Sequence, residues 1–273
     1  MAFKLGDVIV DRLQFGYGAK SNGTPLYALT QLKEATMDIS ADSTDITDKD
    51  GNLVYRKYTG KKGEVTAQNA FINLSVIETL SAVDAEIATD SDGIVMPMIL
   101  TVDAGKTLDI TGYVKDSVVV NALSTKGSMG KEYKLGSAAS NTEFAIVDTP
   151  EVKGETPTPA SATLTPPTDT DEVQYIVKFN KVVHSGAKIT NSADKFPRTH
   201  ELFFKALVVD PCDKENLRAA IVHIPSFMPA PDFSLSLQGG DAQNMDYKGA
   251  MMVDTCSTEK ELFSIYYIDE PEE

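Results

Sequence analysis

The sequence predicts a mainly β protein, and three features point to this fold class. Short runs in which polar and apolar side chains alternate recur along the chain, as they do in half-buried strands. Turns that contain Gly or Pro separate these runs. Helical patterns are confined to two short segments. We therefore expect a β-sandwich or barrel-like fold with long loops and one short flanking helix.

The clearest pattern lies between Ala35 and Thr59, where two extended runs flank a turn at residues 48–52. Gly51 supplies the positive φ that a tight hairpin needs. The first run has a polar face and an apolar face. The polar face consists of Thr36, Asp38, Ser40, Asp42 and Thr44, and the apolar face of Met37, Ile39 and Ala41. The second run alternates apolar residues with Arg56 and Lys57, so the sequence predicts a hairpin with a solvated, acidic first strand.

A short amphipathic helix is expected after the hairpin, at about residues 74–86. Its apolar side chains recur every three residues and should form a stripe that packs on the sheet. The stripe consists of Leu74, Ile77, Leu80 and Val83. Before the helix, Lys61 and Lys62 are flanked by Gly60 and Gly63. We interpret them as a flexible loop that contacts another subunit, with phosphate binding as the alternative.

The remaining chain is expected to form further strands joined by long polar segments. Residues 1–23 are predicted to be an irregular arm, and residues 124–142 a surface loop with one short strand. The Pro- and Thr-rich segment 148–172 predicts a linker or arm. It separates an N-terminal half (1–147) from a C-terminal half (173–273), and whether it bounds a domain or interrupts a single one stays open. A second helical turn is expected at 213–220, capped by Asp210 or Asp213.

Charge and targeting signals narrow the functional classes. The chain carries 40 acidic and 25 basic residues, for a net charge of −15. This balance argues against a protein that grips nucleic acid by its phosphates, and suits a surface that must repel DNA. No run approaches the ~20 apolar residues that a membrane span needs, and no signal peptide is visible at the N-terminus. Synthesis in a cytoplasm is therefore expected, where Cys212 and Cys256 favour free thiols, although a disulfide stays open.

No short motif predicts a catalytic, metal or cofactor site. The residues around Gly51 do not fit the helix-loop-helix calcium template, because Ile46 and Lys57 occupy its first and twelfth ligand positions. A looser calcium site that uses Asp48 and Asp50 stays open. The histidines are far apart in sequence and lack the spacing of a zinc motif, so structural roles are expected for His184, His200 and His223.

The order of acidic strand, Asp-Gly turn region, basic strand and helix resembles the N-terminal half of tail tube proteins, the major tail proteins of long-tailed bacteriophages. The closing segment, DFSLSLQGGDAQNMDYKGAMMVDTCSTEKELFSIYYID, resembles the end of those proteins, with three strands and a small-residue turn. The resemblance covers about the first 85 and the last 65 residues. It is a resemblance of pattern and order.

The resemblance implies a structural virion protein without enzymatic activity or cofactors. Members of that family form a β-sandwich-like domain flanked by a helix and assemble as hexameric rings. The rings stack into a hollow tube through which DNA is delivered, with strands of the subunits joined in an inner β-barrel. The implied partners are further copies of the chain and other tail proteins: the tape measure, the tail terminator, and the baseplate or tip. DNA would be present only in transit, and no membrane is involved.

The resemblance also suggests roles for individual residues. The acidic residues Asp38, Asp42, Asp45 and Asp48 would face the channel. In the opposite assignment they face outward and the strand with Arg56 and Lys57 faces the channel. Lysines in loops, namely Lys61, Lys62, Lys126 and Lys131, would contact neighbouring subunits. Two other classes stay open: a non-enzymatic β-sandwich module for binding or adhesion, and an enzyme whose site is assembled from distant residues.

Overall fold

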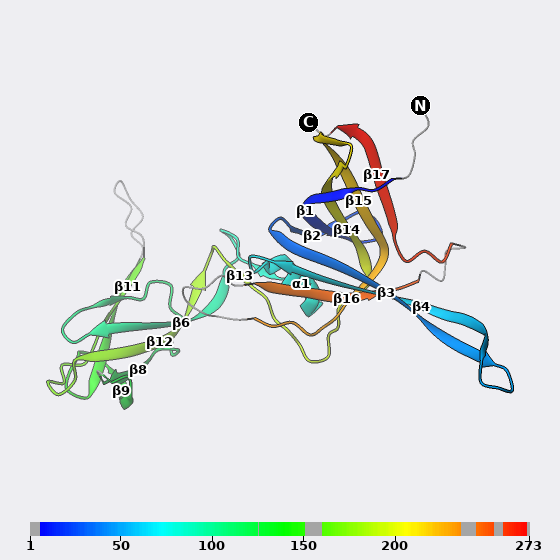
Figure 1. Ribbon diagram of the computed structural model, residues 1–273. Helices are drawn as coiled ribbons and strands as arrows, with labels where there is room; N and C mark the ends of the chain where they lie inside the picture. The colour runs from blue at the N-terminus through cyan, green and yellow to red at the C-terminus, as the bar shows by residue number, and fades with distance from the viewer. Residues whose placement is uncertain (1–5, 125, 151–159, 236–243, 254–258, 272–273) are drawn as a thin grey trace. The chain divides into compact units, whose positions relative to one another are not determined.

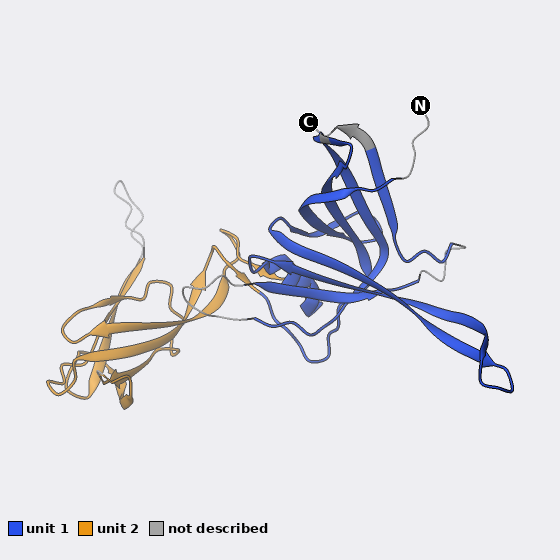
Figure 2. Ribbon diagram, viewed as in Figure 1, with its two compact units in different colours: residues 1–84, 189–273 blue, residues 85–188 orange. Residues whose placement is uncertain are grey.

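The computed structural model describes residues 6–124, 126–150, 160–235, 244–253 and 259–271. The chain divides into two compact units (Figure 2). Unit 1 comprises residues 1–84 and 189–273, and unit 2 comprises residues 85–188, so unit 2 is inserted into the sequence of unit 1. Strands dominate both units, and the described residues contain one α-helix, α1 (Leu74–Ser81). The prediction of a mainly β fold with one short helix is confirmed.

Unit 1 is an eight-stranded sheet that curls into a nearly closed barrel (Figure 1). Its strand order is β2-β1-β14-β15-β16-β4-β3, and β17 pairs with β15. All of the pairs are antiparallel. The strands are β1 (Ile9–Ala19), β2 (Pro25–Leu29), β3 (Leu32–Thr47), β4 (Leu53–Asn69), β14 (His200–Asp210), β15 (Asp213–Pro229), β16 (Met245–Met251) and β17 (Ser264–Pro271). The barrel therefore draws its strands from both ends of the chain.

Two segments of unit 1 differ from the sequence-based expectation. Residues 213–220, predicted as a helical turn, belong to β15, because Leu217 to Ile221 pair with Val209 to Lys205 of β14. Tertiary pairing here overrides local helix propensity. About half of the expected N-terminal arm, Ile9–Ala19, is strand β1, in which Gly16 and Gly18 lie against β2 and β14. Gly18 is required there, because a Cβ atom would lie 2.3 Å from the Tyr27 ring.

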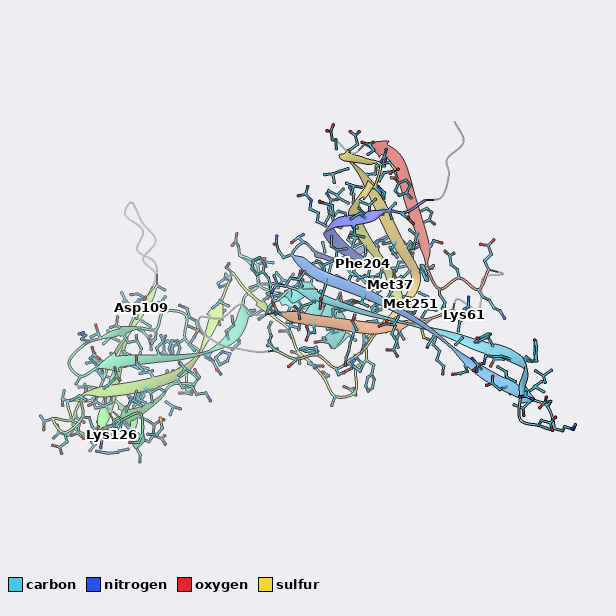
Figure 3. All side chains as sticks on the ribbon, viewed as in Figure 1. Met37, Lys61, Asp109, Lys126, Phe204 and Met251 are labelled. Atoms are coloured by element: carbon cyan, nitrogen blue, oxygen red, sulfur yellow. The ribbon has the colours of Figure 1, made fainter. Side chains whose placement is uncertain are left out.

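The core of unit 1 combines aliphatic and aromatic side chains from its strands with one face of α1. Figure 3 labels Phe204 and Met251 from this core. The buried residues are Tyr27, Leu29, Val65, Ala67, Val76, Leu80, Leu202, Phe204, Ile224, Phe227, Met245, Tyr247 and Met251. Burial of this apolar surface is the main force that closes the barrel.

Helix α1 is shorter than predicted and buries a different set of side chains. The Asn73 side chain accepts hydrogen bonds from the backbone N–H groups of Ser75 and Val76, at 3.0 and 3.2 Å. The helix ends at Ser81, since Ala82 adopts a left-handed conformation with φ of +52°. Val76 and Leu80 are buried, whereas Leu74 is 61% exposed. Leu74 therefore does not belong to the packed stripe, because it lies in the first turn, next to the solvent.

A buried hydrogen-bonded cluster lies inside the barrel. The Tyr27 hydroxyl lies 2.7 Å from His200 Nε2 and hydrogen-bonds the Tyr247 hydroxyl. The Nδ1 atom of His200 lies 3.3 Å from the Arg198 carbonyl, so Nδ1–H donates and Nε2 accepts from tyrosine. Burial lowers the pKa of His200, because desolvation disfavours the imidazolium. It raises the pKa values of Tyr27 and Tyr247 for the corresponding reason.

We expect unit 1 to lose stability as the pH falls below about 6.5, the ordinary pKa of histidine. The unfolded chain takes up the His200 proton before the folded chain does, so acid favours unfolding. The measurement is the denaturant midpoint by circular dichroism at pH 7 and pH 5, for the parent and for His200→Gln. The variant should show a smaller decrease between the two pH values. An equal decrease in both proteins would assign the acid sensitivity to other groups.

Unit 2 is a seven-stranded sheet with a core of its own. Its order is β6-β12-β8-β9-β10-β11-β7, and a separate two-stranded sheet joins β5 to β13. The strands are β5 (Glu86–Ile87), β6 (Ile94–Asp103), β7 (Leu108–Asp109), β8 (Val119–Leu123), β9 (Met129–Gly136), β10 (Glu143–Thr149), β11 (Ser161–Thr165), β12 (Gln174–Val183) and β13 (Ala187–Lys188). Fully buried side chains in its core include Ile110, Leu164, Tyr175 and Phe179.

The Pro- and Thr-rich segment 148–172 lies inside unit 2. Residues 151–159 fall outside the described residues. Ser161–Thr165 forms β11 and pairs with β10, so this part is strand and not linker or arm. Ala162 and Leu164 are buried and alternate with Ser161, Thr163 and Thr165. This period of two explains why a segment so rich in Thr and Pro still forms a strand.

Candidate functional site

The β3–β4 hairpin extends beyond the other strands of unit 1 as a two-stranded ribbon (Figure 1). Every residue from Asp38 to Lys62 is exposed. The turn at its end is held by the Asp48 carboxylate, which accepts hydrogen bonds from the backbone N–H groups of Asp50 and Asn52 at 2.9 and 2.8 Å. The pKa of Asp48 is lowered mainly by the hydrogen bond that it accepts from the Asn52 side chain, and further by the one from the Asn52 backbone N–H. Gly51 has the predicted positive φ, +85°.

One face of the sheet formed by β3, β4 and β16 is polar and exposed. Residues directly opposite each other in antiparallel strands share a face. Asp38 lies opposite Glu64, and Thr36 and Lys248 lie opposite Thr66. Between them on β4, Val65 and Ala67 point to the core. We call this surface the polar face, and it consists of Glu34, Thr36, Asp38, Ser40, Asp42, Lys62, Glu64, Thr66, Gln68, Asp246 and Lys248.

The polar face carries five carboxylates and two lysines. Asp38 and Glu64 occupy directly opposed positions, an arrangement that is destabilising for two like charges. Lys248 interacts with the charges of Glu64 and Asp246, which offsets part of this repulsion.

The structure separates the four acidic residues that were predicted as one set. Asp38 and Asp42 lie on the polar face, where the Asp42 carboxylate lies 3.1 Å from Lys62 Nζ. Asp45 lies opposite Arg56, with two oxygens at 2.6 and 2.8 Å from the guanidinium nitrogens. Alternation along β3 places it on the other face from Asp42. Arg56 lowers the pKa of Asp45 by hydrogen bonding and charge, and Asp48 belongs to the turn.

Three acidic residues of the polar face were missed by sequence reasoning. These are Glu34, Glu64 and Asp246. The alternation of Glu64, Thr66 and Gln68 with buried Val65 and Ala67 contained the signal for Glu64. Asp246 is remote in sequence, and only the pairing of β16 with β4 brings it to this face.

The four candidate lysines differ in their surroundings. Lys61 and Lys62 lie within β4, so the predicted flexible loop is wrong, because the ladder with β3 continues through both (Figure 3 labels Lys61). Lys126 is exposed in the turn between β8 and β9. Lys131 lies in β9 with its Nζ 4.7 Å from the Tyr133 ring centroid and 3.6 Å from an Asp169 oxygen. Lys131 is therefore engaged within unit 2.

The comparison with known families decides the class of the chain. The model of the YomU/Tube protein family matches residues 7–265. The chain belongs to this family. It is accordingly a structural protein of the phage tail tube, a component of the virion tail that associates with copies of itself and with other tail proteins. A search of curated proteins found no match.

The resemblance seen in the two ends of this Tube-family chain is thus confirmed, and the match also spans the inserted unit 2. The family is a structural one, and the histidines of this member have structural surroundings. His200 lies in the core, and His223 pairs with Glu201 at 3.2 Å and stacks on Phe203. His184 Nδ1 lies 3.1 Å from the Thr89 carbonyl.

Other kinds of site find no support in the part of the Tube-family chain that the structure describes. Within those residues, no group of three His, Cys, Asp or Glu side chains could hold a metal ion. Both oxygens of Asp48 are engaged in the hairpin turn. Cys212 is an exposed free cysteine, and Cys256 lies outside the described residues. Among the described helices, none is long and apolar enough to cross a membrane.

Proposed function

We propose that six subunits form a ring, that rings stack into a hollow tube, and that DNA passes along its channel. The observation that carries this proposal is the exposed β3–β4 hairpin, in which β3 pairs with β4 and, among the residues that the structure describes, has no strand at its other edge along the ribbon. An open edge is a template for pairing with another chain. In a closed ring each subunit would cover the edge of its neighbour, so no edge would remain.

The apolar side chains of the hairpin support the same assembly. Large exposed apolar residues are concentrated on this ribbon at 43–66% exposure: Ile39, Ile46, Leu53, Val54, Tyr55 and Tyr58. Exposed apolar surface of this kind is typical of protein contacts. Hairpins of neighbouring subunits packed side by side would bury it.

The polar face is proposed as the channel lining. In this proposal Asp38, Asp42, Glu34, Glu64 and Asp246 face the lumen, and Asp48 lies at the end of the lining. An acidic, hydrated lining would repel phosphates and let DNA slide through. Asp45 is assigned instead to the opposite face of the ribbon, where it pairs with Arg56. The opposite orientation would turn Arg56 inward and is the alternative that a tube reconstruction would test.

Lysines are proposed to contact neighbouring subunits. Lys61 of the hairpin and Lys126 in the β8–β9 turn of unit 2 are exposed and could reach a neighbouring subunit. Lys62 pairs with Asp42, and Lys131 pairs with Asp169. In the proposed contacts, each of these lysines would keep its partner and also bind an acidic group of the neighbouring subunit. The tape measure, the tail terminator, and the baseplate or tip proteins are the proposed heterologous partners.

The proposal is tested by electron microscopy of the purified protein. We expect six-fold rings and stacked tubes with a central channel, and a reconstruction in which β3 and β4 surround that channel. Isolated monomers at all concentrations and salt conditions, or a tube with the hairpin on its outer surface, would contradict the proposal.

Reversing the charge of the proposed lining should make the tube bind DNA. In Asp38→Lys/Glu64→Lys, lysines replace two opposed carboxylates, so phosphates would be attracted and the binding would weaken as salt rises. The measurement is co-sedimentation of assembled tubes with short duplex DNA. The control is Asp90→Lys/Glu132→Lys, which makes the same charge change at exposed positions of unit 2. Equal DNA binding by both variants would show that total charge, and not the lining, is responsible.

A further inference from the structure

A β-bulge interrupts the hairpin where it leaves the barrel. Ala41 of β3 lies opposite Lys61 of β4, and the next residue, Asp42, lies opposite Thr59. Gly60 is therefore an extra residue without a cross-strand partner. Its φ is +61°, in the left-handed region that side chains other than Gly rarely adopt. Bulges of this type bend the strand and increase its right-handed twist.

The bulge lies next to the point where the pairing between β4 and β16 ends. Strand β16 pairs with β4 as far as Gly63, which lies opposite Met251. The contact is close, because a Cβ atom on Gly63 would lie 2.6 Å from Met251 Sδ. Beyond Gly63, β3 is the one described strand that pairs with β4. We call residues 42–59, the part of the hairpin beyond the bulge, the outer ribbon. Its direction relative to the barrel is therefore set at residues 60–63.

The bulge also fixes which side chains share a face. On the barrel side, odd-numbered residues of β4 such as Gly63 and Val65 face the core. Beyond the extra residue, the even-numbered Tyr58 and Arg56 lie opposite Ser43 and Asp45 and continue that face. The exposed ion pair of Asp42 with Lys62 spans the bulge at 3.1 Å.

We infer that Gly60 is a positioning residue for subunit joining: its bulge aims the outer ribbon at the neighbouring copy of the chain. This inference rests on the proposed self-assembly through the hairpin. About six residues of strand at ~3.3 Å each hold the turn roughly 20 Å beyond the bulge. A change of about 10° at Gly60 would therefore move the turn by roughly 3.5 Å, about one residue of strand, and the ribbon would lose its register with the edge that it must pair with.

Deletion of Gly60 is the sharpest test, because it leaves every observed cross-strand pair in place. Thr59 keeps Asp42, and Lys61 keeps Ala41, but the ladder becomes regular and the bend is lost. Gly60→Ala is a second variant that strains the left-handed conformation, and Gly60→Asn should rescue in part, because Asn tolerates that conformation. Gly23→Ala is the matched control: its φ is +82° in open space in the β1–β2 turn.

The first readout is the direction of the ribbon in the monomer. Spin labels at Lys49→Cys and Asp246→Cys, with Cys212→Ser and Cys256→Ser, report the distance between the turn and β16. The deletion should shift this distance distribution, and Gly23→Ala should leave it unchanged. An unshifted distribution in the deletion variant would overturn the assignment of Gly60 as the residue that sets the direction.

The second readout is tube formation by electron microscopy. We expect loss of tubes for the deletion and for Gly60→Ala, partial recovery for Gly60→Asn, and unimpaired tubes for Gly23→Ala, with unchanged circular dichroism spectra. Tubes of the deletion variant at the parent's yield would overturn the inference. A parent that forms no tubes would contradict the proposed function, and with it the assembly part of this inference, while the monomer distances still decide the geometric part.

Discussion

Shortening the β3–β4 hairpin is expected to abolish tube formation and to leave a folded subunit. The design removes residues 42–45 and 56–59, which are four consecutive cross-strand pairs. The turn at 48–52 and the Gly60 bulge are retained, and removing an even number of residues from each strand preserves the alternation of faces. The ribbon becomes ~13 Å shorter. Every deleted residue is exposed, so the core of unit 1 loses nothing.

The effect of length must be separated from the loss of the ion pair between Asp45 and Arg56. The full-length variant Asp45→Asn/Arg56→Gln removes both charges of this pair and keeps all residues of the ribbon. We expect it to assemble, because exposed ion pairs contribute little. Electron microscopy and sedimentation compare the variants. Tubes from the shortened chain would show that subunits join through another surface.

Replacing Leu80 with Ala should lower the free energy of unfolding by ~2–5 kcal/mol. Leu80 is 3% exposed and packs in the core of unit 1 with Val76. Removing its side chain beyond Cβ leaves a cavity that the surrounding strands fill only in part. Denaturant unfolding followed by circular dichroism measures the change, with the transition of unit 1 fitted separately from that of unit 2.

Leu74→Ala is the matched control for this prediction, because it makes the same chemical change on the same helix. Leu74 is 61% exposed, so its loss should change the stability by less than about 0.5 kcal/mol. Equal losses for the two variants would mean that α1 does not pack on the barrel through Leu80. The pair also distinguishes core packing from helix propensity, which changes equally in both.

Local patterns in the sequence were enough to predict the hairpin. The alternation from Thr36 to Thr44 and the Gly51 turn depend only on neighbouring residues. The helix was located for the same reason, although its end at Ser81 depends on the left-handed Ala82. In contrast, residues 213–220 look helical locally and become strand because β14 lies beside them. Such a pairing between distant segments carries no local signal.

Some residues of the candidate site could likewise be predicted from local patterns, and others only from pairing between distant strands. Asp38 and Asp42 were predictable because strand alternation places them on one exposed face. Asp45 could not be separated from them without its partner Arg56, which lies across the ribbon. Asp246 joins the polar face through pairing between strands that are more than 170 residues apart, as Gln68 and Asp246 show by their 2.9 Å hydrogen bond. The Gly60 bulge required the register itself.

The insertion of unit 2 has a consequence for the order of events during translation. Strand β4 emerges from the ribosome early, but its neighbour β16 is synthesised only after the whole of unit 2. Unit 2 is contiguous and can fold as soon as residues 85–188 are available, whereas unit 1 must wait for contacts of long sequence separation. The nascent chain thus holds its hairpin without the strand that supports it at Gly63. In the proposed assembly, subunits join through this hairpin, so the late synthesis of β16 would keep a nascent chain from polymerising before its barrel can close.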